Sequence, residues 1–119
     1  MILEDNLDRI EFFKRVYKNH TLYITRNISE AQGYIHNYEF DIMFLDHDLE
    51  QDNFKSLKEG RTGYDFCKIL VEENTQKESV IFIHSMNPCG GAVMERLLRD
   101  NGYEVQWIPF HLLKLEDRC

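Results

Sequence analysis

Acidic and histidine side chains directly follow two apolar segments of this chain, and these residue types carry out acid–base and metal chemistry. They are Asp46, His47 and Asp48 after residues 41–45, and His84 and Ser85 after residues 79–83. Carboxylates hold cations or move protons, and the pKa of histidine suits proton transfer near neutral pH. Neighbouring parallel strands place their carboxyl ends around one ligand crevice. We therefore predict one site in which these five residues are the candidate catalytic groups.

Two further acids, Glu4 and Asp5, end the first apolar segment. In a doubly wound sheet the first strand lies beside the third, which brings this pair close to Asp46. Crowded carboxylates repel one another unless a proton or a cation lies between them. Mg²⁺ prefers oxygen ligands, so we predict Mg²⁺ as a candidate cofactor with Glu4, Asp5 and Asp46 as its ligands. The alternative is that these acids are solvated or cap helices.

The candidate catalytic residues differ in the roles that they suggest. Successive residues of an extended chain point to opposite sides, so Asp46 and Asp48 are expected to share a side and His47 to face elsewhere. His84 is the candidate general acid or base, and the alternative is a structural histidine at a strand end. Ser85 either attacks the substrate as a nucleophile or hydrogen-bonds a ligand oxygen, and no triad spacing favours the first role.

Residues 87–91, Asn-Pro-Cys-Gly-Gly, have the composition of a helix start. Asn87 is a suitable N-cap, and proline fits the first helical position. Two glycines in a first turn cost about 1 kcal/mol each relative to alanine, which is explained if a ligand approaches the amides of Gly90 and Gly91. Helix N-termini attract phosphate through free amides and the helix dipole. Close packing of the helix is the alternative explanation.

Arg61 and Thr62 open another predicted helix after a polar segment. Arg61 is a candidate for bidentate phosphate binding, and the alternative is an ordinary surface arginine. Together with Asn87, Gly90 and Gly91, these two residues are the candidate substrate-binding residues. The polar segment before them is predicted as a loop that could close over a ligand.

Apolar segments of strand and helix type alternate along the chain. Strands are predicted at 1–3, 21–25, 41–45, 79–83 and 103–108, and helices at 7–17, 29–38, 63–74 and 87–101. Ser29 with Gln32 is read as a capping box for the second helix. The third and fourth strands are continuously apolar, as strands buried on both faces are. We predict one α/β domain over residues 1–119: a doubly wound, five-stranded parallel sheet in a flavodoxin-like, three-layer sandwich.

The composition limits the class of partner. The 119 residues carry 14 Lys and Arg against 21 Asp and Glu, a net charge of −7, which argues against a nucleic-acid polymer as partner. A small anionic, nucleotide-like ligand needs only local groups and stays compatible. Three cysteines without a C-x-x-C pair argue against disulfides and zinc. No membrane-length segment or signal peptide is recognisable, so we expect a cytoplasmic protein without a membrane partner. A homodimer is compatible with the sequence.

The motifs resemble those of receiver domains of two-component signalling. Glu4 and Asp5 match their acidic metal-binding pair, Asp46 their phosphoacceptor aspartate and Ser85 their switch residue. Receivers carry a lysine before the proline that follows the last strand, whereas Ile108 precedes Pro109 here. Without that lysine, the cation that links aspartyl phosphate to the switch is missing, so ordinary phosphorelay is not expected.

A divergent branch, the cyclic-phosphate-processing receiver-like family, is more similar. The shared motifs are D-H-D-L at 46–49, T-G-x-D at 62–65 and H-S-M-N-P at 84–88. The resemblance implies a receiver-like sandwich and activity on cyclic phosphates of nucleotides or ribose, in prokaryotic or phage conflict systems or in RNA or NAD processing.

The sequence is compatible with three functions. The first is a hydrolase that opens a cyclic phosphodiester, for which we expect His84→Ala and Asp46→Asn to abolish turnover with the fold intact. The second is a module that binds or sequesters a cyclic nucleotide without converting it. The third is a degenerate phosphoreceiver that acts through a protein partner.

Overall fold

The computed structural model describes residues 1–49 and 62–116, with side chains described as far as Leu113. Five parallel strands form one sheet in the order β2-β1-β3-β4-β5. The strands are β1 (Ile2–Leu3), β2 (Ile24–Thr25), β3 (Ile42–Leu45), β4 (Val80–Ile83) and β5 (Glu104–Trp107). The helices are α1 (Leu7–Val16), α2 (Ile28–Asn37), α4 (Gly63–Glu73), α5 (Pro88–Asp100) and α6 (Phe110–Glu116). The predicted fold class is confirmed.

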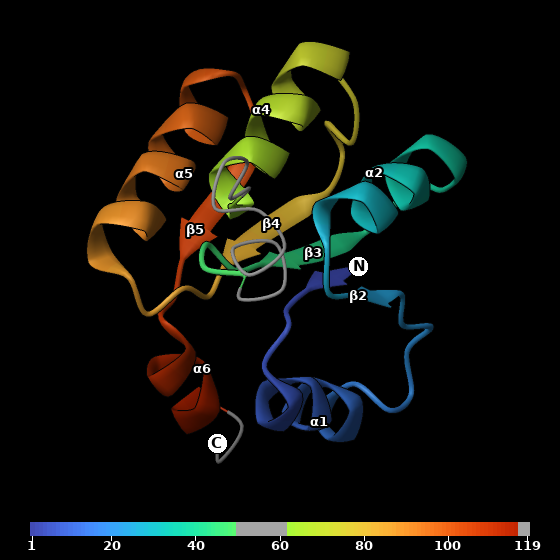
Figure 1. The fold of residues 1–119 in the computed structure, drawn as a ribbon, viewed down its shortest axis with the longest axis vertical. Helices are drawn as coiled ribbons and strands as arrows, with labels where there is room; N and C mark the ends of the chain where they lie inside the picture. The colour runs from blue at the N-terminus through green and yellow to red at the C-terminus, as the bar shows by residue number, and fades with distance from the viewer. Residues whose placement is uncertain (50–61, 117–119) are drawn as a thin grey trace.

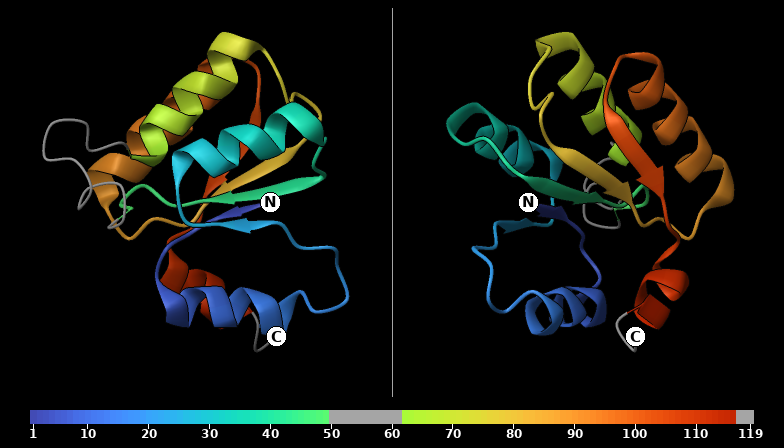
Figure 2. Two further views of the ribbon diagram at one scale, coloured as in Figure 1. Left: turned by 45° about the vertical axis from the view of Figure 1, so that its right-hand side comes forward. Right: turned by 180° about the vertical axis from the view of Figure 1, so that it is seen from behind.

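The helices cover both faces of the sheet and make a three-layer sandwich. α2, α4 and α5 lie on one face, and α1 and α6 lie on the other (Figures 1 and 2). Alternation along the strands divides the apolar side chains between the two layers. Leu3, Leu45 and Ile83 belong to the core under α2, α4 and α5, whereas Ile2 and Phe44 pack with the aromatic rings of α1 and α6.

The register of the three central strands brings the candidate site together. Leu3 pairs with Leu45, and Leu45 pairs with Ile83. The residues one step further along, Glu4, Asp46 and His84, therefore lie side by side at the carboxyl edge. Since Leu3, Leu45 and Ile83 face α2, α4 and α5, strand alternation turns the next side chains toward α1 and α6.

Two local predictions differ from the structure. The second strand is only two residues long, Ile24–Thr25, because residues before it lie outside the ladder. The second helix begins at Ile28 rather than Ser29, and its N-cap is Asn27, whose side chain accepts the amide of Glu30 at 2.8 Å. Asn27 is the N-cap because its side-chain oxygen accepts the amide of Glu30, three residues further along the chain.

Gly63 joins the start of α4 to the backbone of the acidic segment. Its amide donates to the carbonyl oxygen of His47 at 2.8 Å, and a Cβ at Gly63 would overlap the carbonyl oxygen of Asp46. Since that contact is with backbone, no side-chain movement relieves it. The T-G-x-D motif thus fixes α4 against the strand end that carries Asp46.

We expect Gly63→Ala to lower the free energy of unfolding by about 2–3 kcal/mol, the range for overpacking a tight contact. The matched control is Gly33→Ala in α2, where a Cβ meets no atom within 4 Å. That change should raise the free energy of unfolding by about 0.5–1 kcal/mol, since alanine favours helix interiors. Urea denaturation measures both, and equal effects of the two substitutions would contradict the close approach at Gly63.

Candidate functional site

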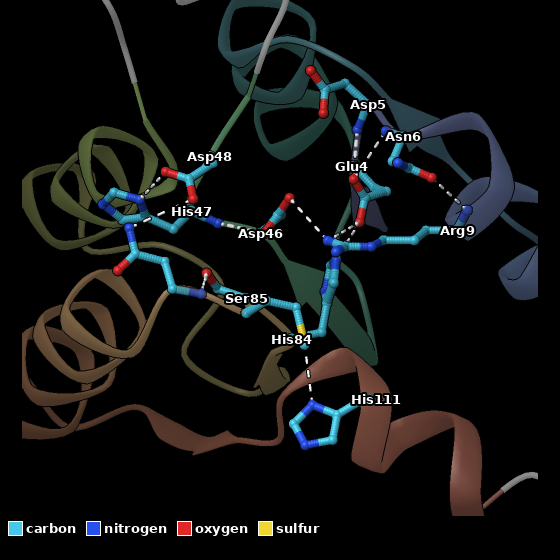
Figure 3. A network of polar contacts seen from close by, with 12 residues as sticks. Glu4, Asp5, Asn6, Arg9, Asp46, His47, Asp48, His84, Ser85 and His111 are labelled. Atoms are coloured by element: carbon cyan, nitrogen blue, oxygen red, sulfur yellow. Dashed lines mark hydrogen bonds and ion pairs between the residues drawn. The ribbon is translucent and has the colours of Figure 1, made fainter.

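Glu4, Asp46 and His84 form a buried cluster at the carboxyl edge of the sheet. One ligand atom from each residue lies within 4.8 Å of the others, and the relative exposure of the three is 0%, 4% and 0%. Figure 3 shows the three side chains converging from β1, β3 and β4. The prediction that acids and a histidine from separate strand ends meet in one place is correct.

Glu4 is held in its charged form by donors on both carboxylate oxygens. Oε2 accepts the amides of Asp5 and Asn6 at 2.9 and 3.0 Å, and Oε1 lies 2.8 Å from Nε2 of His84. Burial by itself raises the pKa of this carboxyl group. The hydrogen bond and charge of His84, the Asn6 amide and Arg9 outweigh burial, so the pKa of Glu4 lies below its ordinary value.

His84 is the member of the cluster that lies deepest among the aromatic side chains. Its ring contacts Phe13 and Phe110 at centroid distances of 5.2 and 6.3 Å, and burial lowers its pKa in spite of the bond to Glu4. Nδ1 is buried and makes no hydrogen bond to any residue that the structure describes. The His84 side chain has no solvent exposure and contacts Glu4, so the geometry favours a role in positioning Glu4, and the acid or base role stays a prediction.

Asp46 has the most perturbed carboxyl group of the cluster. Its Oδ1 accepts the amide of His47 at 2.8 Å. Burial, followed by the negative charge of Glu4, raises the pKa of Asp46 to about 8. A buried carboxyl group beside a carboxylate keeps its proton because both burial and the neighbouring negative charge disfavour its charged form. Such a group exchanges its proton readily for a cation.

Arg9 is the site residue that sequence analysis missed. Its Nη1 lies 3.6 Å from Oε1 of Glu4 and 3.8 Å from Oδ2 of Asp46, as Figure 3 shows. Asn6 caps α1 and accepts the backbone amide of Arg9 at 3.1 Å. A signal was present: a helix that begins two residues after Asp5 turns its first-turn side chains back toward the acids.

Four acids and Arg9 line one hollow of about 150 Å³, here called the acidic hollow. Its lining residues are Glu4, Asp5, Asn6, Arg9, Asp46, Asp48 and Met86. Asp46 and Asp48 therefore share a side, as strand alternation predicted. Asp5 also lies at the hollow, and its carbonyl oxygen accepts Nη2 of Arg26 at 3.2 Å. The predicted metal ligands Glu4, Asp5 and Asp46 all border the same space.

His47, Asp48 and Asn87 form a second polar chain at the rim. Nδ1 of His47 lies 2.8 Å from Oδ1 of Asp48, and Nδ2 of Asn87 donates to Oδ2 of Asp48 at 3.5 Å. The His47 side chain is 17% exposed and that of Asp48 is 57% exposed. A carboxylate that holds one ring nitrogen orients an imidazole for proton transfer at the other, so His47 is better placed for acid–base chemistry than His84.

Gly90 and Gly91 are explained by packing, which was the alternative interpretation. A Cβ at Gly90 would overlap the His47 ring, and one at Gly91 would lie 2.6 Å from Cε2 of Trp107. The Gly90 amide donates to Oδ1 of Asn87 at 3.0 Å and the Gly91 amide to its carbonyl oxygen at 2.8 Å. Since both amides already donate to Asn87, the structure favours packing as the explanation of the glycines, and phosphate binding by these amides stays a prediction.

Ser85, Thr62 and Asn87 have structural partners. Oγ of the fully buried Ser85 accepts the amide of Asn87 at 3.0 Å, so the structure gives Ser85 a supporting role and no nucleophilic partner among the residues described. The amide of Thr62 donates to Oδ2 of Asp65 at 2.7 Å at the start of α4. Arg61 lies outside the described residues.

The amino-acid sequence of the chain matches a protein-family model. Residues 1–100 match the model of the cyclic-phosphate processing receiver domain. The chain belongs to this family. No curated protein matches the chain. The match covers the first four strands, β1 to β4, and includes every lining residue of the acidic hollow.

The donor set of this family member suits a metal ion. Glu4, Asp46 and His84 lie close enough together to hold one, although Glu4 and His84 are hydrogen-bonded to each other. Asp5 and Asp48 are further acidic residues that line the adjoining hollow. A site built from oxygen ligands with room for water is the type that hard divalent cations prefer. No helix among the described residues is long and apolar enough to cross a membrane.

Proposed function

We propose that this protein opens a cyclic phosphate of a small nucleotide-like or ribose-type molecule by hydrolysis in the acidic hollow. The observation that carries the proposal is the convergence of four carboxylates and one guanidinium at the carboxyl edge of a sheet, in a chain that belongs to a cyclic-phosphate processing family. Ligands of open α/β sheets bind at this edge.

The charge of the hollow determines what must accompany an anionic substrate. Glu4, Asp5 and Asp48 with Arg9 leave a net negative site even while Asp46 keeps its proton. A phosphate diester carries one negative charge, so it would be repelled. We propose that Mg²⁺ resolves this conflict, held by Asp5 and Asp46. Mg²⁺ in such sites typically has one or two carboxylate ligands, with waters and substrate phosphate oxygens completing its shell.

The bound cation would supply positive charge for the phosphoryl oxygens. Hydrolysis forms a bond between a water oxygen and phosphorus, breaks one P–O ester bond and protonates the freed ester oxygen. We propose that Asp48, which lines the hollow, accepts the proton of the attacking water, and that His47 fixes the orientation of this carboxylate through Nδ1. The proton that the base has taken up then passes through solvent water to the freed ester oxygen, which restores the base. Glu4 stays bonded to His84 and the two amides, and keeps the first strand end rigid.

We further propose that the ligand is small and that the protein acts in the cytoplasm, in a conflict or nucleotide-processing setting of the kind that the family implies. The net charge of −7 argues against a polyanion. Among the residues described, Cys67 and Cys89 are free, and Cys89 is exposed. An exposed free thiol is typical of a reducing compartment.

The reaction is tested by incubating the protein with cyclic nucleotides and ribose cyclic phosphates and identifying products by mass spectrometry, with Mg²⁺ and with a chelator. We expect a product one water heavier with Mg²⁺, and at least about a 100-fold lower rate with chelator. The matched control is Asp100→Asn, which removes an exposed acid far along α5 and should leave the rate unchanged.

Two outcomes would contradict the proposal. Tight binding of a cyclic nucleotide that is recovered unchanged after denaturation would assign a sequestering module instead. Stable labelling of Asp46 by acetyl phosphate, without any cyclic-phosphate product, would assign a phosphoreceiver.

A further inference from the structure

Arg9 has an unusual position for a guanidinium in an acidic site. It lines the hollow, its side chain is 25% exposed, and its ion-pair distances to Glu4 and Asp46 are 3.6 and 3.8 Å. These distances exceed hydrogen-bond length. The guanidinium also lies over the ring of Phe110, with Cζ 5.0 Å from the centroid. Arg9 is therefore held by charge and by a ring rather than by bonds to its N–H groups.

The N–H donors of Arg9 consequently stay available. The described residues provide no hydrogen bond to its side chain, although the guanidinium carries five donors in a fixed planar fork. A charged group at the mouth of a hollow keeps such donors for water or for a ligand. The acceptor that best matches the fork is a carboxylate or a phosphate, which binds two N–H groups at once.

Other groups near the described site that could bind an anion already donate hydrogen bonds within the protein. The amides of Gly90 and Gly91 are bonded to Asn87, and Arg26 donates to the carbonyl oxygen of Asp5. Ile108, where receivers carry a lysine, packs in the apolar cluster with Phe44. Among the described residues that line the hollow, Arg9 is the one with a positively charged side chain.

We propose that Arg9 is the residue that binds the phosphoryl oxygens of the substrate, through two guanidinium N–H groups directed into the acidic hollow. This inference rests on the proposed function and adds the substrate contact to it. Glu4 and Asp46 hold the guanidinium by charge, the Phe110 ring supports one face, and the Asn6 cap fixes the backbone. The arginine is thus positioned before the substrate arrives, which lowers the entropy cost of binding.

The test measures binding of inorganic phosphate and of a non-hydrolysed cyclic nucleotide by isothermal titration calorimetry in the presence of Mg²⁺. We expect Arg9→Gln to weaken both by at least about tenfold, and Arg9→Lys to weaken them by a smaller factor because lysine cannot bind bidentately. The control is Lys14→Gln, which removes an exposed cation of the same helix and should leave both affinities unchanged.

A second measurement separates ligand contact from simple charge balance. Removing the positive charge beside Glu4 and Asp46 should leave the Mg²⁺ affinity of Arg9→Gln equal or higher, while phosphate affinity falls. Unchanged phosphate affinity in Arg9→Gln, full affinity in Arg9→Lys, or no phosphate binding by the unmodified protein would overturn the proposal. If Arg9→Gln fails to fold, Arg9→Lys decides alone. Since these experiments need no turnover, the product screen judges the proposed reaction separately.

Discussion

Asp46→Asn is expected to lower turnover of a cyclic phosphate by at least about 100-fold while making the folded protein more stable. The activity falls because asparagine is a poorer cation ligand than a carboxylate in this hollow. The stability rises because a buried carboxyl group next to Glu4 is unfavourable in its charged form. Opposite effects on activity and stability are characteristic of residues kept for function.

The pH dependence of stability follows from the same carboxyl group. Its pKa is about 8 in the folded protein and 3.8 in the absence of the fold. Between these values the folded state retains a proton that the unfolded chain has lost. The contribution of the Asp46 carboxyl group to stability is therefore full below about pH 4, falls as the pH rises toward 8, and is constant above that.

Urea denaturation with a chelator present measures this effect at pH 5 and pH 8. One pKa unit corresponds to about 1.4 kcal/mol, and we expect Asp46→Asn to gain on the order of 2 kcal/mol at pH 8, with a smaller gain at pH 5. The gain stays below the full shift because asparagine is itself a polar side chain that must be buried at this position. A destabilised variant at pH 8 would show that the Asp46 charge supports the fold.

His84→Ala is expected to lower the free energy of unfolding by about 3–5 kcal/mol. Removing the imidazole leaves the buried Glu4 carboxylate without this hydrogen-bond donor, and an uncompensated buried charge typically costs this much. The lost ring also leaves a cavity among Phe13, Phe44 and Phe110. The sequence led us to expect that this substitution would leave the fold intact. Complete burial of His84 and its 2.8 Å bond to Glu4 argue against that expectation.

His84→Gln separates the bond from the ring. The glutamine amide can still donate to Glu4, so this variant should lose less stability than His84→Ala, by roughly half. The control His20→Ala removes an exposed histidine and should change stability by less than about 0.5 kcal/mol. Thermal and urea denaturation compare the three variants. Equal stability of His84→Ala and His20→Ala would contradict the role of His84 as the support of Glu4.

Sequence reasoning succeeded where strand order and strand alternation decide the outcome. Glu4, Asp46 and His84 each follow a buried strand residue, and the order of the parallel strands determines that they meet. The alternation also predicted that Asp46 and Asp48 would share the hollow. These inferences need only the two-residue period of a strand and the topology of a doubly wound sheet.

Sequence reasoning failed where helix packing decides the outcome. The glycines of α5 had two explanations, and only the positions of His47 and Trp107 favour packing. The helix start beside the acids was predictable, but the approach of the Arg9 guanidinium to Glu4 and Asp46 depends on how α1 packs against the sheet. Similarly, the depth of His84 depends on Phe13 and Phe110 from two helices on the same face of the sheet.

The most direct test of the account is a map of amide chemical shifts by NMR as Mg²⁺ and then a cyclic nucleotide are added to the protein. We predict the largest changes at the amides of Asp5, Asn6, Asp46 and His47, which border the acidic hollow, and small changes at Gly90 and Gly91. Large changes confined to the start of α5, with the amides beside Glu4 and Asp46 unaffected, would contradict a ligand site in the hollow.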